Sequence, residues 1–124
     1  IICGGNKWRD NKSEKIIEFI RECFKKEIKV AAICDAVTFL AANGFLENNK
    51  HTGNTLEHLK THAPNYTGEK NYVEKQAVRD GGLITANGSA ALEFSYEILE
   101  ELEVLNKKEI KGWYNIFKNG YLAE

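Results

Sequence analysis

A short, uninterrupted apolar run leads directly into a cysteine and then into a helical pattern. The run is V-A-A-I at residues 30–33, and Cys34-Asp35 follows it at once. Such a run is typical of a parallel strand that is covered on both faces. Residues 36–43 have the spacing of a short helix, which Gly44 closes as a left-handed cap. A strand that turns directly into a helix predicts an α/β domain with a mostly parallel sheet.

The rest of the chain alternates between helix-like and strand-like stretches. Apolar periodicity predicts helices over 13–27, 54–60, 89–105 and 108–118, and strands over 1–3, 30–33, 50–53, 76–80 and 83–85. Asp80-Gly81-Gly82 joins the last two strands as a hairpin, and 61–75 is expected to be a loop. In the last helix we expect Trp113, Tyr114 and Phe117 in the core, with a dimer contact as the alternative. The pattern therefore predicts one domain over residues 1–124, with helices on both faces of the sheet.

Composition excludes several classes of partner. Seventeen basic against eighteen acidic residues leave a net charge of −1, which argues against nucleic acid or a membrane as the main partner. Cys3, Cys23 and Cys34 cannot all pair with one another and form no CxxC motif, which favours a reduced, cytoplasmic protein. The histidines and cysteines show no metal-ligand spacing, so neither a metal nor a cofactor is expected.

The first residues are unusually apolar. The chain opens with Ile1-Ile2-Cys3 and contains no methionine. Such a start resembles the end of a buried strand, so we expect residues 1–3 to form a central strand beside 30–33. We also expect the 124 residues to be a piece of a longer protein.

Cys34 is the residue with the clearest chemical potential. Its place at the end of a strand puts it at the carboxyl edge of the sheet, where open α/β folds bind their ligands. The following helix would point unpaired N–H groups at the sulfur and favour a thiolate. A small, inert cysteine buried at a strand end fits the same pattern, and both interpretations remain open.

The pair Gly4-Gly5 follows the first strand. Glycines at such a place let the backbone approach a ligand and expose its N–H groups. If the first strand neighbours 30–33, the N–H groups of Gly5 and Asp35 could together hold an oxyanion near Cys34. A plain tight turn is the alternative.

Three blocks of sequence resemble the PfpI/ThiJ family of the class I glutamine amidotransferase-like superfamily. They are I-I-C-G-G-N-K-W at 1–8, A-A-I-C-D-A-V-T-F-L-A-A-N-G-F-L at 31–46, and D-G-G-L-I-T-A-N-G-S-A-A-L-E-F at 80–94. The resemblance implies a flavodoxin-like three-layer α/β sandwich with Cys34 as the reactive cysteine. It also implies that Gly5 and Asp35 occupy the oxyanion-hole positions. Members of the family begin with a further strand–helix half, whose glutamate hydrogen-bonds the cysteine.

Both positions at which that family customarily has a histidine hold other residues in this chain. In the protease-like branch a histidine directly follows the cysteine, where this chain has Asp35, and other members have one where this chain has Asn54. His51 is expected to face elsewhere by strand alternation, and His58 and His62 to lie on the surface. Because acyl transfer needs a partner that takes and returns protons, these replacements weaken the case for proteolysis.

Two functions remain open from the sequence. The first is a cysteine-dependent hydrolase or amidase that acts on a small molecule or peptide. The second is a non-catalytic stress-response or redox-sensing protein in which Cys34 is oxidised. A homo-oligomer is expected in either case. The candidate site residues are Cys34 as nucleophile, Gly5 and Asp35 at the oxyanion, and Gly4, Asn54 and Asn87 around the substrate.

Overall fold

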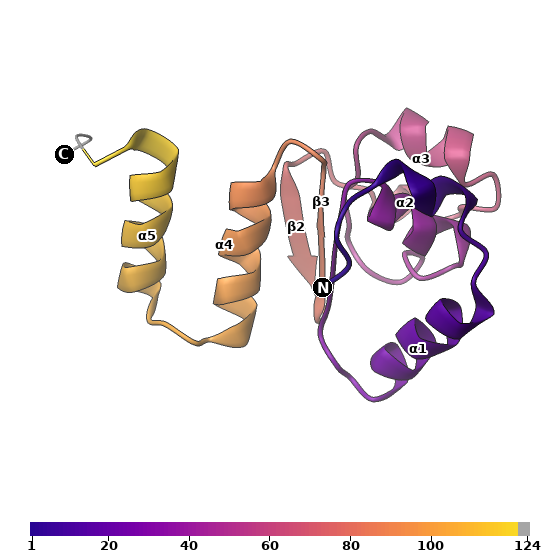
Figure 1. Cartoon of the computed structure of the whole chain (residues 1–124), viewed down its shortest axis with the longest axis horizontal. Coiled ribbons are helices and arrows are strands. Elements are labelled where there is room, and N and C mark those ends of the chain that lie inside the picture. Colours follow the sequence, from indigo (N-terminus) through magenta and orange to yellow (C-terminus); the bar gives the residue numbers. More distant parts are fainter. Residues whose placement is uncertain (122–124) are drawn as a thin grey trace.

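The computed structural model describes residues 1–121 of the chain. Two 3-10 helices, five α-helices and three strands follow one another in these residues: η1 (Asn6–Asp10), α1 (Glu14–Lys25), β1 (Val30–Ile33), α2 (Asp35–Ala42), α3 (Leu56–His62), η2 (Glu69–Asn71), β2 (Ala77–Asp80), β3 (Leu83–Ala86), α4 (Ala91–Leu102) and α5 (Lys107–Asn119). Figure 1 shows α1, α2 and α3 on one side of the sheet and α4 on the other, with α5 outermost. The layers confirm the expected flavodoxin-like α/β architecture.

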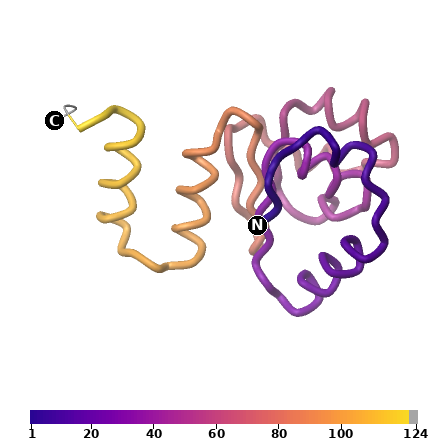
Figure 2. The backbone as a smooth tube through the Cα atoms, in the orientation of Figure 1, coloured from indigo at the N-terminus to yellow at the C-terminus, as the bar shows by residue number. Residues whose placement is uncertain are grey.

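The sheet has three strands in the order β1-β3-β2. β1 runs parallel to β3, with Val30 opposite Leu83 and Ile33 opposite Ala86. β2 and β3 form the predicted antiparallel hairpin. Its turn requires glycine, because Gly81 and Gly82 have φ angles of 57° and 84°. The parallel pair places the ends of β1 and β3 side by side, and the trace in Figure 2 follows the long connection between them.

The hydrophobic core fills both faces of the sheet. The larger cluster includes Ile20, Phe39, Leu40 and Leu59 and lies between the sheet and α1, α2 and α3. The smaller cluster, around Ile84 and Phe94, lies between the sheet and α4. Burial on both faces explains why β1 reads as a continuous apolar run rather than as an alternating pattern.

Two of the predicted strands are reduced to single bridges. His51 pairs with Tyr72 and Ile2 with Ala32, both in parallel orientation. The prediction of a strand over 50–53 is therefore wrong, because a single bridge is too short to form a strand. Ile2 lies beside β1 as expected, and within residues 1–121 no strand pairs with its other side. The central position of this strand stays a prediction.

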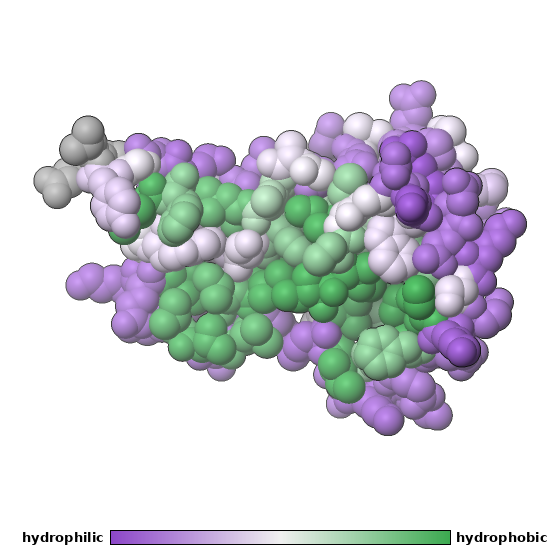
Figure 3. All heavy atoms as spheres, viewed as in Figure 1, coloured by the Kyte–Doolittle hydropathy of each residue, from purple (hydrophilic) through white to green (hydrophobic). Residues whose placement is uncertain are grey.

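The last two helices form a hairpin on the outside of the domain. α4 is shorter than expected, because Glu103 adopts a left-handed conformation and ends it. The expectation that Trp113, Tyr114 and Phe117 lie in the core is wrong: the first two are half-buried and Phe117 is 68% exposed. α5 packs against α4 rather than against the sheet, so only a narrow stripe of it is covered. Figure 3 shows the apolar surface that results on this face.

No helix in the described part of the chain has both the length and the apolar character needed to cross a membrane.

Candidate functional site

Cys34 lies between β1 and α2, at the junction that the sequence predicts. Its backbone has φ 61° and ψ −133°, a conformation that is strained for any residue with a side chain. The N–H of Cys34 donates to the carbonyl of Ala86 on β3 (3.0 Å), and its own carbonyl accepts from the N–H of Val37 (3.0 Å). A strained strand-to-helix turn that presents a nucleophile is the geometry of a nucleophile elbow. The thiol is half-buried, whereas that of Cys3 is exposed and that of Cys23 is buried.

Two glycines pack directly against Cys34. A Cβ atom on Gly4 would lie 2.9 Å from Cβ of Cys34, and one on Gly88 would lie 2.9 Å from its Sγ. Both distances are too short for real atoms, so the site admits no side chain at either position. Gly88 is missing from the sequence-based prediction. Its signal is its place just after β3, the strand that pairs with β1.

Asn54 connects the sulfur to this second glycine. Its Nδ2 donates to Sγ of Cys34 (3.6 Å), and its Oδ1 accepts from the N–H of Gly88 (2.8 Å). An N–H donor at this distance stabilises negative charge on the sulfur. Asn54, predicted to line the substrate pocket, therefore lies beside Cys34.

A pocket of about 410 Å³ opens next to Asn54. Gly53, Asn54, Thr55, Leu56, Tyr72, Glu74, Lys75, Gln76 and Asn87 line it. Oδ1 of Asn87 accepts hydrogen bonds from the N–H and the hydroxyl of Ser89, which fixes its side chain at the wall. The structure thus brings Asn54 and Asn87 to one pocket and places Gly4 at Cys34. Their roles toward a substrate remain predictions, as do those of the N–H groups of Gly5 and Asp35.

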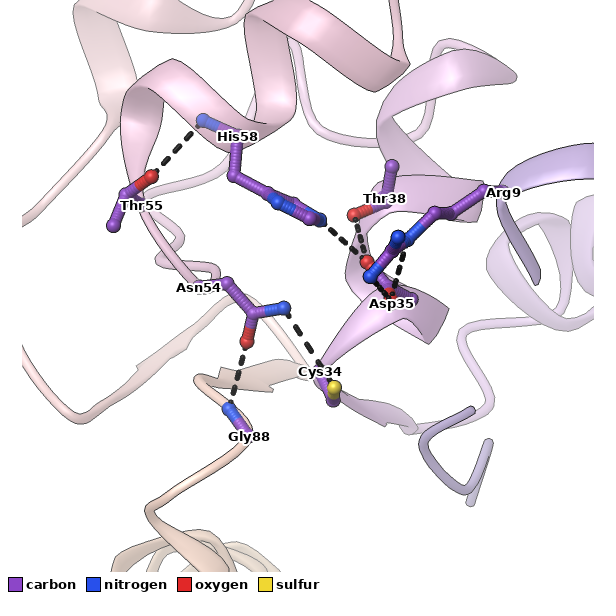
Figure 4. A network of polar contacts seen from close by, with 8 residues as sticks. All are labelled: Arg9, Cys34, Asp35, Thr38, Asn54, Thr55, His58 and Gly88. Atoms are coloured by element: carbon purple, nitrogen blue, oxygen red, sulfur yellow. Dashed lines mark hydrogen bonds and ion pairs between the residues drawn. The ribbon is translucent and has the colours of Figure 1, made fainter. Parts of the chain in front are cut away.

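The carboxylate of Asp35 is buried beside the elbow, with the residue only 1% exposed. Nε and Nη2 of Arg9 both lie 2.8 Å from its Oδ2. Oγ1 of Thr38 donates to its Oδ1 (3.1 Å), and Nε2 of His58 lies 2.6 Å from the same oxygen (Figure 4). Burial raises the pKa of Asp35, but the hydrogen bonds from Arg9, His58 and Thr38 outweigh it and hold the pKa below its usual value. Asp35 is therefore ionised at neutral pH, so Nε2 of His58 carries the hydrogen that it donates.

His58 corrects the expectation of a surface histidine. Thr55 caps α3 by accepting from the backbone N–H of His58 (2.9 Å), which places His58 in the first turn, facing α2. His62, expected in a loop, is the last residue of α3, and its ring centroid lies 4.5 Å from that of His58. The available signal was Asp35 itself, because an acidic residue placed against a buried strand end requires partners.

His51 lies away from the elbow and is fully buried. Its Nδ1–H donates to the carbonyl of Asn49 (2.7 Å), and its Nε2 accepts from the hydroxyl of Tyr66. Burial lowers the pKa of His51 and raises that of Tyr66 to about 12, so both are neutral at physiological pH. This pair anchors the 61–75 segment. Among residues 1–121, no group of three or more histidine, cysteine or acidic side chains is arranged to hold a metal ion.

Comparisons with known proteins agree with this arrangement. The model of the DJ-1/PfpI family matches residues 1–101. The chain is 38% identical to the uncharacterized protease YoaZ of Bacillus subtilis over 95% of its own length and 56% of that protein's. It is 40% identical to the uncharacterized protease YdeA of the same organism, over 98% of this chain and 60% of that protein. The chain thus spans little more than half the length of these relatives.

Solved structures show the same fold. A thiJ/pfpI family protein from Bacillus anthracis superimposes with a TM-score of 0.89 at 42% identity, over 94% of this chain and 55% of that one. The DJ-1 superfamily protein Atu0886 from Agrobacterium tumefaciens superimposes with a TM-score of 0.80 at 33% identity, over 92% of this chain and 60% of that one. Together with the family model, these matches show that the chain belongs to the DJ-1/PfpI family.

Proposed function

We propose that Cys34 is the nucleophile of a cysteine-dependent hydrolase or amidase that acts on a small molecule or peptide. The observation that carries this proposal is the strained elbow, which presents a half-buried Sγ between Gly4 and Gly88. Strain of this kind persists only where the surrounding structure enforces it, and it concentrates at functional sites. The names of the two Bacillus subtilis relatives, both described as uncharacterized proteases, support the same reaction class.

The reaction would begin with attack of the Cys34 thiolate on the carbonyl carbon of an amide. The C–N bond then breaks, a thioester forms, and the amine leaves with a proton that balances the one lost by the thiol. Water hydrolyses the thioester and regenerates the thiol. Negative charge develops on the carbonyl oxygen in both steps, and the N–H groups of Gly5 and Asp35 are proposed to stabilise it.

Hydrolysis of a panel of fluorogenic peptide amides by the protein tests this proposal. Cys34→Ala should abolish turnover, and Gly88→Ala should reduce it by about tenfold or more, because its methyl group would lie 2.9 Å from Sγ. Gly112→Ala on α5 is the matched control, since its Cβ would meet nothing within 4 Å. Turnover by Cys34→Ala at the rate of the unmodified protein would contradict the proposal.

Oxidation of Cys34 is a second candidate, favoured by one observation. Among the described residues the side chain that hydrogen-bonds Sγ is the amide of Asn54, which stabilises a thiolate but exchanges no protons. A thiolate attacks one oxygen of hydrogen peroxide, the O–O bond breaks, hydroxide leaves and a sulfenic acid remains. Mass spectrometry after peroxide treatment should then find added oxygen on Cys34 before Cys3. Oxidation of Cys3 first would contradict this candidate.

We further propose that the protein works in the cytoplasm as a homo-oligomer. The exposed apolar side chains of the α4–α5 hairpin, including Leu105, Ile116 and Phe117, support association with a second copy. Sedimentation equilibrium should give a mass above that of one chain, and Phe117→Glu should lower it. A monomer at all concentrations would contradict the oligomer.

A further inference from the structure

Three separate segments meet at the buried carboxylate of Asp35. Arg9 comes from η1, Asp35 opens α2 and His58 lies in the first turn of α3 (Figure 4). The same three segments build the site around the sulfur. Cys34 directly precedes α2, and its two neighbours Gly4 and Asn54 precede η1 and α3. The ionic cluster therefore joins the same three segments that surround Cys34.

Local contacts connect Arg9 to Gly4 within one segment and His58 to Asn54 within another. Trp8, next to Arg9, donates from its backbone N–H to the carbonyl of Gly5 (3.2 Å) and from Nε1 to the carbonyl of Cys3 (2.9 Å). On the other side, the Thr55 cap fixes the first turn of α3 directly after Asn54. A displacement of Arg9 or His58 would thus be transmitted to the residues that contact the thiol.

We propose that Asp35 is the positioning residue of the reactive-cysteine site. Through Arg9 and His58 it holds Gly4 and Asn54 against Sγ of Cys34. Together with Arg9 it also sets the balance of charge near a Cys34 thiolate. This role of the side chain adds to the oxyanion-stabilising role proposed for the backbone N–H of Asp35, and it rests on the proposed function of Cys34.

Electrostatics links the same groups. The pKa of Arg9 is raised, chiefly by its hydrogen bond to Asp35. By Coulomb's law, a cation such as the guanidinium of Arg9 favours a thiolate near it, whereas an anion such as the carboxylate of Asp35 disfavours one. The other ionisable groups on these elements are Lys7 and Asp10 on η1 and Glu57, His58, Lys60 and His62 on α3.

The opposite charges of Arg9 and Asp35 should shift the pH dependence of Cys34 labelling in opposite directions, which a purely structural role would not do. In the whole protein, the pH at which half of Cys34 reacts with iodoacetamide is followed by mass spectrometry. Arg9→Gln should raise that midpoint by about half a pH unit or more, because a cation is lost, and Asp35→Asn should lower it by a similar amount. Arg9→Lys should restore most of the midpoint. His62→Gln, one turn further along α3 and without a hydrogen bond to Asp35, should leave the midpoint unchanged.

Shifts in the same direction for Arg9→Gln and Asp35→Asn, or no shift in either, would overturn the proposal. Should Asp35→Asn fail to fold, the two Arg9 variants decide alone: restoration of the midpoint by Arg9→Lys supports the charge balance set by Arg9 and Asp35, and a midpoint equal to that of Arg9→Gln overturns the proposal. The titration reports on the thiol whether or not the protein hydrolyses amides. A failure of the proposed hydrolase is therefore seen separately, in the peptide-amide assay.

Discussion

Two arginine-centred ionic clusters lie within residues 1–121, one on each side of the sheet. Arg9 pairs with Asp35 at the elbow, and the side chain of that carboxylate is 2% exposed. Arg79 on β2 pairs with Glu97 and Glu101 of α4, both at 3.0 Å, and those carboxylates are 26% and 14% exposed. Similar groups at similar distances thus occupy environments that differ mainly in access to water.

This difference in burial indicates different roles. Around Arg79 water can solvate every charge, so each pair contributes little and can be exchanged for others. Asp35 has lost its water and depends on protein donors from three segments, so its loss should affect all three at once. We infer that the exposed cluster adds modestly to the packing of α4, whereas the buried cluster determines the geometry around Cys34.

The largest effect is expected from Asp35→Ala. Removal of the carboxylate leaves the donors of Thr38 and His58 without a buried acceptor, although Arg9 can turn toward water. The free energy of unfolding should fall by about 3 kcal/mol. Urea denaturation followed by circular dichroism measures the change. A loss below about 1 kcal/mol would place Asp35 in the same class as an exposed pair.

Acid should affect the buried cluster in a defined pH range. Because the pKa of Asp35 is lowered in the folded protein, its contribution is fully present above the ordinary carboxyl pKa and is lost as the pH falls through the lower, folded value. Asp35→Asn should lack that part of the pH dependence. Denaturation from pH 7 down to about 2 compares the two proteins across the carboxyl range. Parallel curves would contradict an ionised Asp35.

A smaller effect is expected from Thr38→Val, which removes the hydrogen bond to Oδ1 of Asp35 and leaves the other donors in place. The free energy of unfolding should fall by about 1 kcal/mol. Thr38→Ser, which keeps the hydroxyl, is the control and should lie closer to the unmodified protein. Equal losses in the two variants would mean that the hydroxyl, which Thr38→Ser keeps, is not the source of the loss.

The smallest effect is expected from Arg79→Gln in the exposed cluster. The loss should be less than about 1 kcal/mol in dilute buffer and should shrink further in about 1 M salt, which screens exposed charges. Urea titrations at low and high salt measure both values. A loss as large as that of Asp35→Ala, or one insensitive to salt, would remove the contrast between the clusters.

The sequence predicted best those features that depend on neighbouring residues. The apolar run at 30–33 predicted the elbow at Cys34, and Asp80-Gly81-Gly82 predicted the hairpin. Both succeeded because adjacent residues determine where a strand ends and where a turn or helix begins. The contacts of Asp35 were missed, since Arg9 and His58 lie 26 and 23 residues away along the chain. Spacing alone does not show which distant segments fold together.

The last helix shows a related limit. Apolar periodicity correctly predicted a helix with an apolar face, and α5 is bounded by a capping box between Asn106 and Glu109. Periodicity does not say what covers that face, and Phe117 remains exposed. Gly88 was missed for a similar reason, because its close approach to Sγ exists only once β1 and β3 are paired.

The central claim is that the elbow makes Cys34 the reactive thiol of this protein. Its most direct test is the pH dependence of iodoacetamide labelling at all three cysteines in the folded protein, resolved by mass spectrometry. Cys34 should react at lower pH than the more exposed Cys3, because only Cys34 has the N-terminus of α2 and the amide of Asn54 beside its sulfur, and buried Cys23 should react last. Labelling of Cys3 at the same pH as Cys34, or before it, would contradict the account.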